Sequence, residues 1–321
     1  MTHILLTGAG FTRNWGAWLG AEAFEYLLGC PDVTEELRRE LWIDQNKGSG
    51  FESTLARLQQ ETNRPGRQEM VDRLTRALVG MFNTMDLGLK DAFLEAEEGR
   101  SRDIAAFLAK FDAIFSLNQD LFLERKYAPV MSVLNPQRFA GFGSPGMSVP
   151  NPHMGGGEDL ITAKRTPLAE SEFRTNPNTQ PYFKLHGSSN WYDSTGTNHL
   201  LVMGGNKTGA IRKSPLLNWY SEQFDHYMLQ GARLMVIGYS FGDPHINASI
   251  MTGAQAGARV FIIDPAGTSV LDQREGVIKL AQSDLMSAVQ PALIGASRRP
   301  LKSTFGSDAV EYHRVMTFFN W

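Results

Sequence analysis

The chain has 321 residues, of which 42% are hydrophobic and 20% charged, and its formal net charge is -3. This ordinary globular composition lacks the basic excess that nonspecific nucleic-acid binding requires, so we expect no direct nucleic-acid partner. The single cysteine, Cys30, excludes an intrachain disulfide and a zinc site built on several thiolates, and it fits a reducing cytoplasm. We find neither a basic leader nor an apolar stretch of roughly 18 residues, and therefore predict no signal peptide and no membrane span.

The first predicted element is a short buried strand at residues 4–6, followed by Gly8, Ala9 and Gly10. Glycines in this position let the backbone turn tightly and approach a pyrophosphate, whose charge would lie against amide donors and a helix N-terminus. A plain glycine turn is the alternative, because the third glycine of the usual dinucleotide fingerprint is not in its place. From about residue 25 to residue 110, charged amphipathic patterns without a strand-like run predict a helical insertion.

The next predicted strand, residues 113–117, leads into Asn118 and Asp120. Polar residues at the carboxyl end of a parallel strand lie where open α/β sheets bind ligands. An amide and a carboxylate two residues apart could bond a ribose and a carboxamide, or either residue could cap the following helix.

The segment from about residue 127 to residue 182 holds eight of the fifteen prolines together with a Gly-Gly-Gly run, and we predict a loop-rich insertion there. A weaker strand candidate, residues 182–185, precedes His186 and Gly187. A neutral imidazole can accept a proton from a hydroxyl or water, and the glycine would leave room for a ligand beside it. A structural histidine is the alternative.

In the last third of the chain, Leu217, Tyr220, Phe224 and Met228 recur at helical spacing and predict one apolar helix face. Two further strands follow, at residues 234–237 and 260–263. The first runs into a turn that contains Gly238 and Ser240 and precedes a helix that Asp243 could cap, and the second ends in Asp264.

Strands that alternate with helical patterns indicate an α/β fold, a Rossmann-like parallel sheet with helices on both faces. We predict one domain over residues 1–321 that carries the helical and the loop-rich insertions.

The order of the signals resembles the sirtuin (Sir2) family: a Gly-Ala-Gly turn, Asn-x-Asp, His-Gly, Gly-x-Ser and an acidic strand end, between residues 8 and 264. The resemblance implies a domain that binds NAD as a substrate and needs no metal. It implies that Asn118 lies near the nicotinamide ribose and the attacking water, that Asp120 grips the carboxamide, and that His186 is the base. The NAD-binding residues that it implies are Gly8, Ala9, Gly10, Gly238 and Ser240, with Thr12 where the family usually has serine. Gly187 and Asp264 are further candidates from their places at strand ends, and Arg13 is either a phosphate or ribose contact or a surface residue.

Two departures from the deacetylase sirtuins narrow the expected activity. The four cysteines of their zinc ribbon are absent between residues 188 and 237, and Arg13-Asn14-Trp15-Gly16 replaces their Gly-Ile-Pro-Asp-Phe-Arg segment. In both respects the chain is similar to the bacterial Sir2-like NAD hydrolases of antiphage defence. That resemblance implies cleavage of NAD to nicotinamide and ADP-ribose, a homo-oligomer, and regulation by a partner such as a HerA-type ATPase or an Argonaute-like protein.

Two alternatives stay open. The chain could be an NAD or ADP-ribose sensor that acts by assembly, which would need the phosphate turns without His186, or it could be a protein deacylase or ADP-ribosyltransferase. The aromatic C-terminus, Phe318-Phe319-Asn320-Trp321, is either core or a docking tail.

Overall fold

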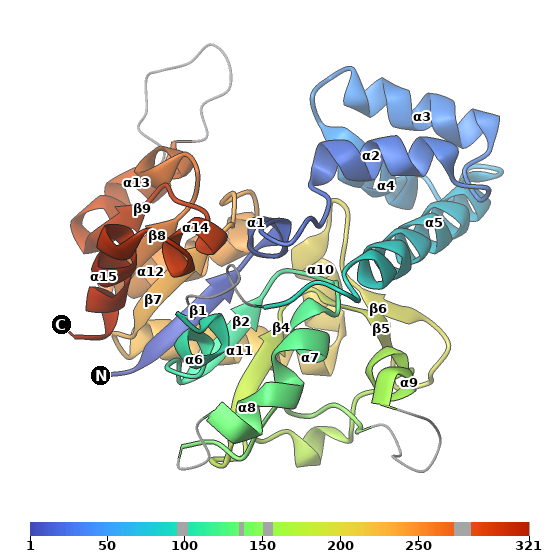
Figure 1. Cartoon of the computed structure of the whole chain (residues 1–321). Coiled ribbons are helices and arrows are strands. Elements are labelled where there is room, and N and C mark those ends of the chain that lie inside the picture. Colours follow the sequence, from blue (N-terminus) through green and yellow to red (C-terminus); the bar gives the residue numbers. More distant parts are fainter. Residues whose placement is uncertain (95–101, 135–137, 150–156, 273–283, 321) are drawn as a thin grey trace.

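The computed structural model describes residues 1–94, 102–134, 138–149, 157–272 and 284–320 (Figure 1). Seven strands, all parallel, form one sheet in the order β3-β4-β2-β1-β7-β8-β9. They are β1 (His3–Thr7), β2 (Ala113–Ser116), β3 (Gly141–Gly143), β4 (Thr179–Lys184), β7 (Arg233–Ile237), β8 (Arg259–Ile263) and β9 (Leu293–Ser297). A small antiparallel pair, β5 (Gly187–Tyr192) and β6 (His199–Leu201), stands apart. The predicted α/β, Rossmann-like class is confirmed.

Helices surround the sheet, and α2–α5 gather in Figure 1 as a lobe beyond α1. The helices up to β4 are α1 (Ala9–Arg13), α2 (Gly20–Gly29), α3 (Glu35–Gln45), α4 (Gly50–Gln60), α5 (Arg67–Gly88), α6 (Ile104–Leu108), α7 (Phe122–Lys126), α8 (Ala128–Leu134) and α9 (Gly157–Thr162). Those after it are α10 (Lys207–Lys213), α11 (Pro215–Leu229), α12 (Pro244–Gln255), α13 (Asp284–Val289), α14 (Leu301–Phe305) and α15 (Ala309–Met316). Within the described ranges, no helix is both long enough and apolar enough to span a membrane.

Successive side chains of a strand point to opposite faces of the sheet, and an apolar cluster buries each face. In β1, Leu5 joins one apolar cluster, to which α5, α6 and α14 contribute among other helices, while Ile4 and Leu6 join the other. The second cluster contains α12 and the face of α11 that the helical spacing predicts, and all four of its predicted side chains are buried. The strands therefore read as continuous apolar runs rather than alternating ones.

The topology places a crevice at the carboxyl ends of the central strands. The strands β2, β4 and β3 lie on one side of β1 within the sheet. After β4 the chain crosses to β7, which pairs with the other side of β1. Where connections diverge in this way, the loops that leave the strand ends separate and a ligand can enter between them. The turns after β1 and β7 meet at this point.

The predicted elements differ from the observed ones in several places. Between residues 127 and 182, the structure contains α8, β3, α9 and the first residues of β4, so this stretch is less loop-rich than predicted; Gly155 and Gly156 lie outside the described residues. The sequence missed β3, which has three residues, and the start of β4, because Pro181 argues against a strand. It also missed β9, where Gly295 stands in the strand because a Cβ there would lie 2.5 Å from the Phe261 ring.

The C-terminal aromatic residues that the structure describes belong to the core. Phe318 is buried, and its ring packs on Phe261 and His3, while Phe319 packs on Phe107 and Phe111. The docking-tail interpretation is not supported for these two residues, and Trp321 lies outside the described part of the chain.

Candidate functional site

A cleft of about 910 Å³ opens at the carboxyl ends of β1, β2, β7 and β8, within the size range of small-molecule sites. Nine of the twelve site residues expected from the sequence line it: Gly8, Ala9, Gly10, Arg13, Asn118, His186, Gly238, Ser240 and Asp264. Thr12, Asp120 and Gly187 do not line it. The structure thus brings together residues from five separate segments of the chain.

The glycines of the two central turns allow the turns to touch. A Cβ on Gly8 would lie 2.5 Å from the Gly238 carbonyl oxygen, and a Cβ on Gly238, whose φ is +62°, would lie 2.3 Å from the Gly10 carbonyl carbon. The N–H of Gly10 donates to Gly238 O at 2.9 Å, and the N–H of Gly8 donates to Ile237 O at 3.0 Å. These two amides are therefore engaged within the protein, and the glycines serve to shape the floor of the cleft.

The turn after β7 is strained and braced. Phe241 has a φ of 57°, which makes it the one non-glycine residue with positive φ among those described, and its ring is fully buried. Its carbonyl oxygen accepts a bond from the Asn247 side chain at 2.6 Å. The Tyr239 hydroxyl accepts the N–H of Asp243 at 3.0 Å. These contacts fix the place of Asp243, whose side chain does not cap α12 as predicted.

Asn118 is oriented from behind. Its side-chain N–H donates to Thr12 Oγ1 at 3.0 Å, and the Thr12 hydroxyl bonds the carboxylate of Asp120. Because the amide nitrogen is held, the carbonyl oxygen of Asn118 is the atom left to face a ligand or water. Thr12 and Asp120 form a second layer behind the wall of the cleft. Asp120 Oδ1 also accepts the N–H of Phe122 at 3.0 Å, although the N-cap of α7 is Leu121 and not Asp120 as the helix-capping alternative expects.

A buried ionic cluster supports this wall. Lys184 is fully buried at the end of β4, and its Nζ donates to Asp120 O at 2.6 Å, Ser188 Oγ at 2.7 Å and Glu124 Oε1 at 2.9 Å. Burial raises the pKa of Asp120, an effect that the nearby Lys184 opposes. The cluster ties β4, β5 and α7 together, since a buried charge is tolerated only when it is paired and hydrogen-bonded.

Gly187 has a structural role next to His186. Its φ is +75°, and a Cβ would lie 1.9 Å from the carbonyl oxygen of Leu200, so only glycine allows β5 and β6 to pair this closely. The space beside His186 that the sequence analysis assigned to a ligand is filled at this point by backbone.

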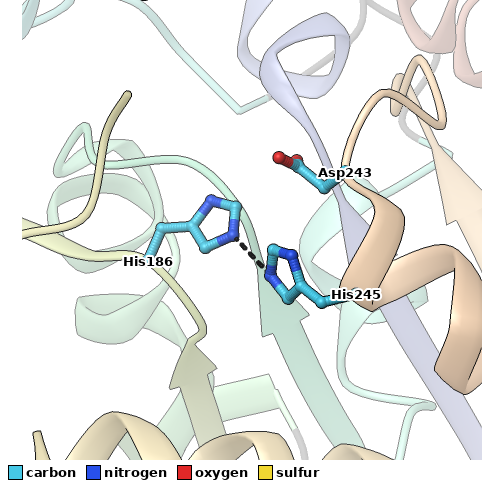
Figure 2. A group of neighbouring side chains, drawn as sticks. All are labelled: His186, Asp243 and His245. Carbon is cyan, nitrogen blue, oxygen red and sulfur yellow. Dashed lines mark hydrogen bonds between the residues drawn. The ribbon is translucent and has the colours of Figure 1, made fainter. Parts of the chain in front are cut away.

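His186 faces a second histidine that the sequence analysis did not single out (Figure 2). The Nε2 atoms of His186 and His245 are 3.1 Å apart, and the carboxylate of Asp243 lies close to both, with the ligand atoms of all three within 4.8 Å of one another. Burial lowers the pKa of His186 to about 3 and also lowers the pKa of His245. Burial opposes ionisation of Asp243, but the neighbouring His186 and Lys207 lower its pKa.

Lys207 links the helical lobe to this group. Its Nζ lies 2.7 Å from Asp243 Oδ1 and 2.8 Å from Glu52 Oε2 of α4. Burial opposes protonation of Lys207, but the two carboxylates raise its pKa. All three side chains line the cleft.

Further basic residues of the cleft were missed because β9 was missed. Arg299 and Lys302 line the cleft just after this strand. Arg13 lines it from α1 and is paired with Glu22 at 2.5 Å. Asp264 lies at the end of β8 and accepts the N–H of Ala266 at 2.8 Å. The cleft therefore has basic side chains from α1 and from the segment after β9, together with the carboxylates of Glu52, Asp243 and Asp264.

A family model described as "SIR2-like domain" matches residues 112–280 of the chain. The chain is similar to the crystal structure of a Sir2 homolog–NAD complex, with 11% identity, a TM-score of 0.44, and coverage of 99% of this chain and 90% of that one. A structure described as a basis for the mechanism and regulation of Sir2 enzymes matches with 13% identity, a TM-score of 0.39, and coverage of 98% and 93%. No curated protein matches the sequence.

Proposed function

The chain belongs to the SIR2-like domain family, and from this premise we propose that it is an NAD glycohydrolase, which cleaves NAD to nicotinamide and ADP-ribose. The proposal depends on one observation above all: Asn118 and His186 line the same cleft as the two glycine turns and Asp264. Asn118 and His186 are suited to a reaction at the ribose. The glycine turns and the basic side chains are suited to a dinucleotide.

The proposed reaction breaks the bond between the ribose C1′ and the nicotinamide nitrogen. The bonding electron pair leaves with nicotinamide, water adds to the oxocarbenium-like carbon, and the proton of that water passes to a base. His186 is the proposed base. The carbonyl oxygen of Asn118, fixed through Thr12, is proposed to orient the water or a ribose hydroxyl. Arg13, Arg299 and Lys302 supply charge that complements the pyrophosphate.

The absence of a second, third or fourth cysteine supports hydrolysis over deacylation. The only cysteine, Cys30, is buried directly after α2, so the chain lacks the thiolates of the zinc ribbon found in deacetylase sirtuins. Water is then the acceptor that we propose for the ribose.

The test is turnover of NAD by purified protein carrying single substitutions. We expect His186→Ala and Asn118→Ala each to lower kcat by about 100-fold or more, in the range of base removal and lost positioning. Matched controls are His226→Ala and Asn218→Ala, two α11 residues that do not line the cleft. Full activity of the His186 variant would disprove its role as base. Tight NAD binding without cleavage by the wild-type protein would favour the alternative of a sensor that acts by assembly.

We further propose that the activity serves antiphage defence by depleting NAD, in a homo-oligomer controlled by a partner such as a HerA-type ATPase or an Argonaute-like protein. This proposal extends the resemblance stated from the sequence. Cells that express the wild-type protein with its neighbouring genes should lose NAD on infection, and cells that express Asn118→Ala should not. Equal NAD levels in the two infected cultures would contradict it.

A further inference from the structure

The facing histidines have the spacing of two metal ligands. Their Nε2 atoms are 3.1 Å apart, and two nitrogen ligands at about 2.0–2.1 Å from a tetrahedral zinc ion are themselves about 3.3 Å apart. Asp243 supplies a third donor within 4.8 Å (Figure 2). The two imidazoles can face each other in this way only if a proton lies between them, and a cation can replace that proton.

The donor set selects a class of ion. Two imidazoles and one carboxylate suit zinc and its neighbours in the first transition row, whereas magnesium and calcium prefer oxygen ligands alone. In the local charge balance, Asp243 and Glu52 are negative and Lys207 is positive. The two carboxylates can therefore offset part of the charge of a divalent cation.

The three ligands are held in place before an ion arrives. Asp243 is fixed by Tyr239 and Lys207, and Lys207 engages Oδ1 of Asp243 so that the other oxygen can bind an ion. His245 lies in the first turn of α12. His186 is buried on the link between β4 and β5. A prearranged site loses little conformational entropy on binding.

The position of the group leaves one coordination site accessible. His186 lines the main cleft, His245 lines an adjoining cavity of about 650 Å³, and Asp243 lines both. An ion bound by all three would lie where the two spaces meet. Three protein ligands with an open fourth position are typical of zinc sites that exchange water or ligands, rather than of closed structural sites.

We propose that His186, His245 and Asp243 bind a divalent cation of the zinc class, and that the bound ion inhibits the enzyme reversibly by occupying Nε2 of His186. The inhibitory part rests on the proposed NAD hydrolysis, because it assigns the metal to the nitrogen of the proposed base. The metal site itself depends only on the three side chains.

Binding is measured first, without NAD. Tag-free protein is stripped with a chelator and titrated with Co²⁺, whose visible absorption reports coordination by nitrogen ligands, and Zn²⁺ is then added to displace it. We expect one ion per chain, with affinity lowered more than about 10-fold by His245→Ala and by Asp243→Asn, since even outer-shell changes cost that much. His226→Ala should bind as the wild type does. Circular dichroism and melting curves show whether each variant is folded.

Wild-type affinity and spectra in the folded His245→Ala and Asp243→Asn proteins would overturn the metal site. Inhibition is then measured as NAD turnover with and without Zn²⁺. We expect Zn²⁺ to inhibit wild type and the His226 variant, and His245→Ala to lose this sensitivity relative to its own metal-free rate. Stimulation by Zn²⁺ would overturn the inhibitory role. A protein that binds Co²⁺ through the three residues yet never cleaves NAD would contradict the proposed function and leave the metal site standing.

Discussion

At the scale of single residues, Thr12 shows how a side chain outside the cleft can control one inside it. Its hydroxyl receives the side-chain N–H of Asn118 and passes its own hydrogen toward Asp120. This chain of bonds fixes which end of the amide faces the cleft, a choice that Asn118 alone would leave open. We therefore propose that Thr12 positions Asn118 for the proposed reaction.

Replacing the hydroxyl should reveal this role. We expect Thr12→Val to lower kcat for NAD by about 10-fold with little change in KM, because the Asn118 amide loses its orientation while the floor of the cleft remains. Thr12→Ser keeps the hydroxyl and should restore most of the rate. Thr304→Val is the matched control, since Thr304 is equally buried and its hydroxyl has no partner among the described residues. Equal kcat values for the two valine variants would argue against positioning.

Asp86 gives the protein a pH-dependent stability. It lies on α5, accepts the N–H of Leu121 at 2.9 Å, and is buried. Burial, and then the charge of Asp120, raise its pKa from 3.8 to about 7. Between these values the folded protein keeps a proton that the unfolded chain has released. The stability that this bound proton contributes is therefore complete below about pH 4 and is lost as the pH rises toward 7.

Asp86→Asn should remove this loss, because an amide oxygen can still accept the N–H of Leu121 without ionising. We expect the wild-type free energy of unfolding to fall between about pH 5 and about pH 8 by more than that of the variant, with a difference of up to about 3 kcal/mol. Urea denaturation at both pH values measures it. Asp72→Asn, at an exposed position of α5, is the control. Parallel pH profiles for wild type and Asp86→Asn would contradict the assignment.

At the scale of elements, the contact between the turns after β1 and β7 determines the shape of the cleft. Gly238 combines a positive φ with backbone atoms where a Cβ would stand, 2.3 Å from Gly10 C and 2.4 Å from Phe11 N. Gly257 also has a positive φ, of +104°, but nothing lies within 4 Å of a Cβ there. Comparing the two separates backbone strain from steric collision.

Gly257→Ala should cost about 1 kcal/mol of stability from the left-handed conformation alone. Gly238→Ala should cost several kcal/mol, because the two turns must also move apart. Thermal denaturation measures both, with about 1–2 °C expected for each kcal/mol in a chain of this size. Equal melting temperatures in the two variants would show that the turns after β1 and β7 are not in tight contact.

The strands illustrate what local sequence can reveal. β1, β2, β7 and β8 were predictable because they are buried on both faces and are apolar without interruption. Strand β9 was not predictable, because it contains Gly295. The ring of Phe261 on the neighbouring strand leaves no room for a Cβ there, a contact that no local pattern encodes. Losing β9 also hid Arg299 and Lys302.

At the scale of the whole molecule, the site is made by contacts between distant segments. Asn118 and His186 were predicted as site residues from their places after strands, but their hydrogen-bond partners are 106 residues away in one case and 59 in the other. Asp120 and Gly187 stand close to these residues in the sequence, yet neither lines the cleft. Only the packed fold decides which residues of such a segment face the cleft.

The proposed hydrolysis of NAD predicts a fixed balance of products. Purified protein, alone and with the products of neighbouring genes, is incubated with NAD, and nicotinamide and ADP-ribose are quantified by chromatography. We predict equal amounts of the two products, formed by wild type and lost in Asn118→Ala. Quantitative recovery of intact NAD under every condition, despite demonstrated binding in the cleft, would contradict the claim that this site consumes NAD.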